Sequence, residues 1–137
     1  MVASTDNGIL KCSVVGSVDE VVERLFSILH GKGITVFVVV DHSVVVDHSG
    51  EAAKIGPQMP NTKPVVFGNP QAGTPVMLAA PSSALDLPLK ILIAQGADGS
   101  TRISYNSVAY LQKRHELSTV LIEHIAGIEN IVEALAH

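Results

Sequence analysis

Residues 89–105, Leu89-Lys-Ile-Leu-Ile-Ala-Gln-Gly-Ala-Asp-Gly-Ser-Thr-Arg-Ile-Ser-Tyr105, contain the pattern that decides the fold. Two runs of strand-forming residues, 89–94 and 101–105, flank Gly96-Ala-Asp98-Gly99, which is the clearest hairpin signal in the chain. A hairpin joins two antiparallel strands. The sequence therefore predicts an antiparallel pair of strands here.

Further strands and helices are predicted on both sides of this hairpin. Residues 9–15 alternate, with Leu10, Cys12 and Val14 on the inward face. Ser17-Val-Asp-Glu20 forms a capping box in front of an apolar stripe that runs to Leu29. More strands are predicted from Ile34 and over 65–67, and helices over 51–55, over 70–80, over 107–114 and from 117 onward. We therefore expect one α+β domain spanning 1–137, with its core in 8–136, a mixed or antiparallel sheet of about five strands, and helices packed mainly on one face.

Composition narrows the class of protein. The 137 residues are 47% hydrophobic with a net charge of −4, which argues against disorder, and nine basic against thirteen acidic residues argue against a nucleic-acid partner. No apolar run approaches the roughly 20 residues that span a bilayer, so no membrane partner is expected. A single cysteine, Cys12, cannot form an internal disulfide, which favours a cytoplasmic protein. So many apolar residues in a small domain also favour a homodimer.

A tandem duplication interrupts the strand that begins at Ile34. Val38-Val-Val-Asp-His-Ser43 is followed at once by an identical copy, Val44-Val-Val-Asp-His-Ser49. Because the repeat length is even, both copies present their side chains with the same parity, so His42 and His48 point to one face of a strand. The sequence predicts an overhanging strand, a looped-out copy, or exchange between protomers.

The turn after residues 65–67 is the strongest candidate for a binding site. Gly68 permits close backbone approach, Asn69 can cap a helix, and Pro70 suits the first position of that helix. The free N–H groups at such a helix start favour binding of an anion. An ordinary strand-to-helix turn has the same composition.

Lys90 interrupts an apolar strand, so its amine needs a partner, for which Asp86 and a bound anion are both candidates. A lysine that reaches solvent from a half-exposed strand is equally compatible with the sequence.

The histidines form no metal motif, and the sequence predicts neither a metal nor a cofactor. His124 lies near the middle of the apolar stripe of the last predicted helix, so it is either a histidine buried in the core or in an interface, or an acid/base group lining a pocket. His115 is expected to be exposed or to cap a helix.

Four sequence blocks resemble a known family, the domain of unknown function 302 family. They are Asp47-His48-Ser49-x-x-Ala52-Ala53-x-x-Gly56, Val66-Phe67-Gly68-Asn69-Pro70-x-x-Gly73-Thr74-Pro75, Leu85-Asp86-Leu87-Pro88-Leu89-Lys90 and Tyr105-Asn106. The resemblance implies a small α+β domain and no established activity. It needs only one Asp-His-Ser, and the second copy is the one contiguous with the next block.

Together these patterns predict a non-enzymatic module that binds or senses a small ligand. Its expected pocket contains His48, Gly68, Asn69, Lys90 and Tyr105, and its ligand is expected to be anionic and partly apolar. One alternative is a small enzyme that uses His48 or His124 as a general acid or base together with Lys90. Another is a structural interaction module without a pocket.

Overall fold

The computed structural model describes residues 3–4, 7–43, 45–46, 52–53 and 59–137. An antiparallel sheet in the order β1-β2-β8-β7-β6-β3 forms its main layer. The strands are β1 (Ala3–Ser4), β2 (Ile9–Val14), β3 (Thr35–Val39), β6 (Thr62–Gly68), β7 (Leu89–Gln95) and β8 (Thr101–Asn106). The predicted hairpin joins β7 to β8, in register at Ile93 and Ile103.

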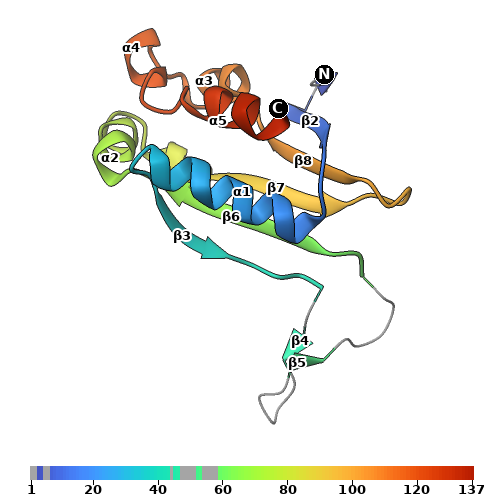
Figure 1. Cartoon of the computed structure of the whole chain (residues 1–137). Helices are drawn as coiled ribbons and strands as arrows, with labels where there is room; N and C mark the ends of the chain where they lie inside the picture. The colour runs from blue at the N-terminus through green and yellow to red at the C-terminus, as the bar shows by residue number, and fades with distance from the viewer. Residues whose placement is uncertain (1–2, 5–6, 44, 47–51, 54–58) are drawn as a thin grey trace.

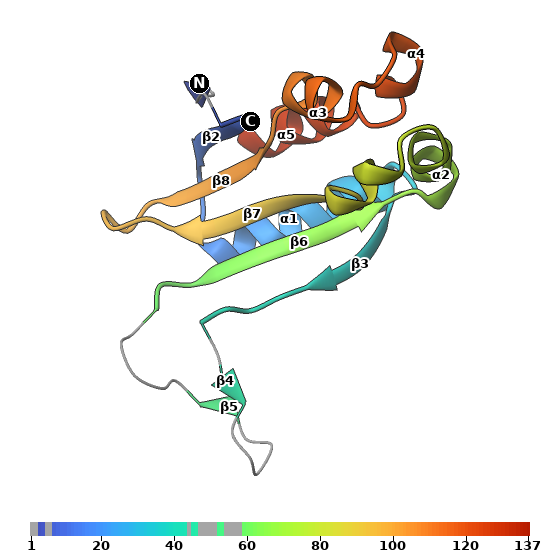
Figure 2. The same cartoon turned by 180° about the vertical axis from the view of Figure 1, so that it is seen from behind.

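The helices cover one face of this sheet (Figure 1). Helix α1 (Val18–Gly31) lies across β6 and β7, and α5 (Ile128–Ala136) packs beside α1 and over β2. Figure 2 shows the opposite face, where no helix covers the middle of β6, β7 and β8. The α+β architecture with one helical layer confirms the predicted fold class.

Shorter helices gather at one end of the sheet, where β6 ends and β7 begins. They are α2 (Pro70–Ala79), the 3₁₀ helix η1 (Pro81–Leu85), α3 (Val108–His115) and α4 (Thr119–Ile122). The predicted C-terminal helix is divided, because residues 123–127 separate α4 from α5. Within the described part of the chain, no helix combines the length and the apolar character needed to cross a membrane.

Local sequence signals explain where α1 begins and what it buries. Ser17 accepts a hydrogen bond from the Glu20 backbone N–H while the Glu20 carboxylate accepts one from the Ser17 N–H, completing the predicted capping box. Val21, Leu25 and Leu29 on one stripe are fully buried. They belong to a continuous core whose other fully buried members include Val65, Val76, Ile91, Ile93 and Ile103.

The two copies of the repeated hexapeptide occupy different surroundings. The first copy continues the pairing of β3 with β6, because the N–H groups of Val40 and His42 donate to the carbonyls of Pro64 and Thr62. From the second copy, Val45–Val46 (β4) pairs with Ala52–Ala53 (β5) in a separate two-stranded sheet. The helix predicted over 51–55 is therefore wrong at Ala52 and Ala53. His48 lies outside the described residues.

Replacing Leu25 with alanine should lower the free energy of unfolding by about 2–5 kcal/mol, because it leaves a cavity between α1 and the sheet. The matched control is Leu78→Ala on α2, whose side chain is 79% exposed and whose loss should cost no more than about 0.5 kcal/mol. Urea unfolding at pH 7 measures both. Similar losses in the two variants would contradict the assignment of Leu25 to the core.

Candidate functional site

The turn between β6 and α2 is shaped by a close contact at Gly68. A Cβ atom on Gly68 would lie 3.3 Å from the Phe37 ring and 3.5 Å from Cβ of Pro88, so a larger side chain would press against the ring. Asn69 caps α2, and its Oδ1 accepts a hydrogen bond of 2.9 Å from the Gln71 N–H.

The same cap uses up the backbone donors that the sequence offered for an anion. The carbonyl of Asn69 accepts hydrogen bonds from Ala72 and Gly73 at 2.9 and 3.0 Å, and Pro70 has no N–H. No backbone N–H group of residues 70–73 is therefore available to bind an anion at the first turn of α2. An anionic ligand must find its donor elsewhere.

Gly68 and Asn69 line a cavity of about 190 Å³ whose walls are mainly apolar. The other wall residues come from three parts of the chain: Phe37; α2 and the block 85–90, with Pro70, Ala72, Gly73, Thr74, Met77, Leu87, Pro88 and Leu89; and the segment between α4 and α5, with His124 and Ile125. A smaller hollow of about 80 Å³ shares Gly68, Asn69 and His124 with it. The cavity thus lies where the motif blocks 66–75 and 85–90 meet.

His124 reaches this cavity because the C-terminal helix is broken. Its N–H donates to the Leu121 carbonyl at 3.1 Å, just beyond α4, and its side chain is exposed. His124 is therefore not buried in the core of the chain, and it lies on a pocket wall, as the alternative interpretation expected. Gly127, directly before α5, was the available sequence signal for the break, because glycine disfavours the interior of a helix.

Lys90 lies outside the wall of this cavity. It pairs with Val66 and shares with that residue the face of the sheet that the helices leave bare; its side chain is half-buried. Among the described residues it forms no ion pair. Asp86, which the sequence offered as a partner, contacts Arg114 and His115 instead.

Tyr105 lies on the helix-covered face and lines a different cavity, of about 410 Å³, together with Cys12 and Glu129. Burial raises the pKa of the Tyr105 hydroxyl, and the neighbouring Cys12 and Glu129 add to this effect. Burial also raises the pKa of the Cys12 thiol, as expected for an inert inward-facing cysteine. Of the predicted site, the structure therefore brings together Gly68 and Asn69, and it places Lys90 and Tyr105 apart from them.

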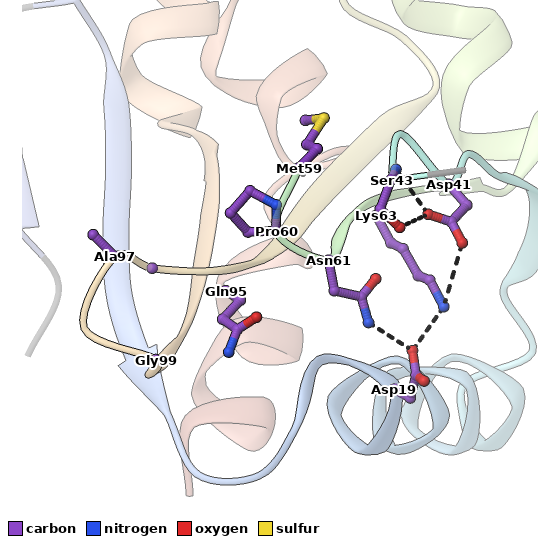
Figure 3. Close-up of a pocket in the computed structure, with 11 residues that line it drawn as sticks. Asp19, Asp41, Ser43, Met59, Pro60, Asn61, Lys63, Gln95, Ala97 and Gly99 are labelled. Carbon is purple, nitrogen blue, oxygen red and sulfur yellow. Dashed lines mark hydrogen bonds and ion pairs between the residues drawn. The ribbon is translucent and has the colours of Figure 1, made fainter. Parts of the chain in front are cut away.

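A second, polar pocket at the opposite end of β6 and β7 was missed by the sequence reasoning (Figure 3). This open hollow of about 590 Å³ centres on Lys63, whose Nζ lies 2.7 Å from Asp19 and 4.0 Å from Asp41. Asn61 also donates to Asp19, at 3.1 Å. Both carboxylates neutralise the amine, so the cluster ties α1 and the end of β3 to β6 rather than offering a free cation.

The pKa values of both carboxylates respond to these contacts. Hydrogen bonds from Lys63 and then Asn61 lower the pKa of Asp19. The pKa of Asp41 is lowered mainly by the hydroxyl of Ser43. The available sequence signal was parity: Lys63 lies two and four residues before the inward-facing Val65 and Phe67, so it shares their face of the strand.

Comparison with known proteins identifies the class to which this small α+β domain belongs. Residues 10–135 match the family described as "Domain of unknown function DUF302". The chain therefore belongs to the DUF302 family, as its motif blocks had indicated.

Proteins with related sequences and structures extend this result. A protein named "Fluoride-specific ion channel FluC 1" from Brucella suis biovar 1 is 32% identical over 117 residues, which are 85% of this chain and 44% of that protein. The protein of the same name from Brucella abortus biovar 1 is also 32% identical, over 41% of its length. The chain thus spans less than half of these relatives. An uncharacterised DUF302 protein from Bacillus stearothermophilus has a similar fold, with a TM-score of 0.72 at 21% identity, covering 94% of this chain and 95% of that one.

Acid titration should reveal the Asp19 contacts. In the unfolded chain Asp19 titrates near the ordinary aspartate pKa of about 3.9, and in the folded chain its pKa is lower. Its stabilisation is therefore complete above that pH and is lost as the pH falls through the folded-state value. Because the side chain is 69% exposed, Asp19→Asn should reduce the loss of stability between pH 7 and pH 3 by less than about 1 kcal/mol.

Urea unfolding at the two pH values measures this difference. The control is Glu23→Gln on the same helix, whose exposed carboxylate forms no ion pair with any described residue. Identical pH dependence in the two variants would show that the Asp19 contacts do not stabilise the fold.

Proposed function

We propose that this chain is a small-ligand binding module whose site is the apolar cavity between α2, the start of β7 and the segment that carries His124. The observation that supports the proposal is that two segments separated in sequence, within 68–74 and 87–89, line one cavity. Ligand sites in proteins are typically concave, mostly apolar and equipped with few polar groups. This cavity has that character.

The walls also suggest the chemistry of the ligand. Phe37, Met77, Leu87 and Ile125 offer contacts for a hydrocarbon part, and the His124 imidazole offers a hydrogen-bond donor or, when protonated, a positive charge. We therefore propose a short apolar carboxylate, with His124 in the role that the sequence had given to Lys90. A volume of about 190 Å³ falls below the ~300 Å³ typical of sites for drug-sized ligands, which favours a small molecule.

The composition of the cavity wall favours binding of a small organic ligand over fluoride binding and over acid/base catalysis. A lone fluoride ion, the substrate named for the Brucella relatives, would gain little from aliphatic and aromatic walls, because a desolvated anion needs several donors. Acid/base catalysis by His124 with Lys90 is less favoured, because Lys90 does not line the cavity. A carbon-containing ligand bound without chemical change fits the site best.

A chain-length series tests the site. Acetate, butyrate and hexanoate should bind with increasing affinity, by about fourfold for each buried methylene, until the cavity is full. Hexan-1-ol should bind more weakly than hexanoate if His124 contacts the carboxylate, and His124→Gln should remove that preference. Chemical-shift titration of the backbone amides measures all four ligands.

Two matched variants locate the binding. Ala72→Leu fills the cavity and should abolish hexanoate binding, whereas the neighbouring Gln71→Leu changes an exposed position outside the wall and should leave it intact. Absence of saturable binding to the unaltered chain, or equal binding by the two variants, would reject the proposed function.

We also propose that the chain forms a homodimer through the β3 edge of the sheet. Strand β3 is the last in the strand order, and Phe37, Val38 and Val40 near its end are exposed apolar residues. An unprotected apolar edge favours pairing with another strand, and an antiparallel pair of identical strands is compatible with two-fold symmetry.

Light scattering tests this assembly. The unaltered chain should have twice the 14.4 kDa mass of one chain, and Val38→Lys should reduce it to the monomer, because a charged edge disfavours pairing. The control is Val15→Lys, at an 83% exposed position beyond the end of β2, which should stay dimeric. A monomeric unaltered chain, or a dimeric Val38→Lys variant, would exclude the β3 edge.

A further inference from the structure

Three polar side chains outside the proposed cavity are joined in a continuous hydrogen-bonded chain. The Ser82 Oγ lies 2.8 Å from Nδ1 of His115, and Nε2 of His115 lies 2.5 Å from Oδ2 of Asp86. Ser82 and Asp86 come from η1 and the residue that follows it, while His115 is the last residue of α3. The expectation that His115 is exposed or caps a helix is therefore wrong.

The backbone is ordered by hydrogen bonds and helix termini on both sides of this array, at the end of η1 and at the end of α3. The Asp86 N–H donates to the Ser83 carbonyl at 2.9 Å, which closes η1. On the other side, Glu116 adopts a left-handed conformation with φ 53° and ends α3 directly after His115. The His115 side chain is only 2% exposed, so its ring is fixed by a hydrogen bond at each nitrogen.

The direction of the hydrogen bonds follows from the partners. An ionised carboxylate can only accept, so Nε2 of His115 carries the proton and donates to Asp86. This tautomer leaves the lone pair of Nδ1 facing Ser82, whose hydroxyl donates to it. Arg114 contacts the same carboxylate, with its Nη1 3.3 Å from Oδ2 of Asp86.

A serine hydrogen-bonded to a histidine that a carboxylate orients is the arrangement that activates a hydroxyl for nucleophilic attack. The two imidazole nitrogens have exchanged roles relative to the common serine-hydrolase arrangement. The capacity for general-base catalysis is retained, because one neutral ring nitrogen can accept the hydroxyl proton while the other nitrogen donates a hydrogen bond to the carboxylate.

Ser82 is also accessible and has an apolar neighbour. Its residue is exposed, whereas the imidazole behind it is buried. In a 3₁₀ helix, side chains three residues apart lie on the same side, which places Leu85 beside Ser82. Leu85 is 72% exposed, so it offers an apolar surface next to the hydroxyl.

We propose that Ser82 is a nucleophile that accepts acyl groups from activated esters with short apolar acyl chains, with His115 as its general base and Asp86 as the residue that positions His115. Oγ of Ser82 bonds to the ester carbonyl carbon while its hydroxyl proton passes to Nδ1 of His115. The ester C–O bond then breaks, and the leaving alcohol oxygen takes that proton from Nδ1, which is again free to accept. Water then attacks the acyl-serine and gives a proton to Nδ1. The acyl C–Oγ bond breaks, and Oγ takes its proton back from His115.

The test is acylation of the full chain by p-nitrophenyl butyrate, followed as p-nitrophenolate release and as butyryl groups located by peptide mass spectrometry. We expect the label on Ser82, formed about 100-fold faster than on Ser27, the lower end of the usual contribution of a general base. Ser27 is an exposed serine of α1 whose hydroxyl donates to the Glu23 carbonyl at 3.3 Å, so it reports the reactivity of an unactivated hydroxyl. Ser82→Ala should remove the label, Ser27→Ala should leave it, and Asp86→Asn should slow its formation.

A second measurement separates activation of Ser82 from a purely structural role of the array, and it does not require loss of His115. In Ser82→Cys, alkylation by iodoacetamide should proceed at lower pH than in Ser27→Cys, because the imidazole accepts the thiol proton. Equal labelling of Ser82 and Ser27 by the ester, or matching pH profiles of the two cysteine variants, would overturn the proposal. Because none of these residues lines the cavity beside His124, either outcome leaves the ligand-binding proposal to its own test.

Discussion

The packing of α1 against the inward face of β6 and β7 is the interaction on which the remaining structure depends. Leu25 and Leu29 of α1 and Ile91 and Ile93 of β7 are completely withdrawn from solvent. Because this core lies on a single face, the connections between strands and helices have to meet at the two ends of the sheet. One end collects the short helices and the apolar cavity, and the other collects the ion pairs around Lys63.

The elements that sequence reasoning predicted correctly are those encoded by neighbours in the chain. The Ser17–Glu20 capping box, the hairpin between β7 and β8 and the cap at Asn69 each need only a few adjacent residues. The break before α5 was missed because a stripe of apolar residues continues across it, and the predicted helix gave that stripe more weight than Gly127. The position of His124 on the cavity wall was therefore foreseen only as an alternative to burial.

The candidate site was harder to predict, because its members meet only through tertiary structure. Gly68 and Asn69 were found from local turn chemistry, whereas the pairing of His115 with Ser82 and Asp86 joins α3 to η1 and leaves no spacing signal. Lys90 and Tyr105 could have been separated in advance. Once Ile93 is opposite Ile103, strand alternation puts Tyr105 on the side of Ile91 and Ile93, and Lys90 on the other side.

Deletion of either copy of the repeated hexapeptide has the same effect on the sequence. Excising 38–43 or excising 44–49 yields one and the same polypeptide, since the two copies are identical. In that shorter polypeptide the surviving copy can keep the ladder contacts that Val40 and His42 make with β6, because those contacts use backbone groups and an unchanged order of side chains. Gain or loss of six residues therefore changes the length of the connection between β3 and β6, which contains the β4–β5 pair, and leaves the register of the main sheet unchanged.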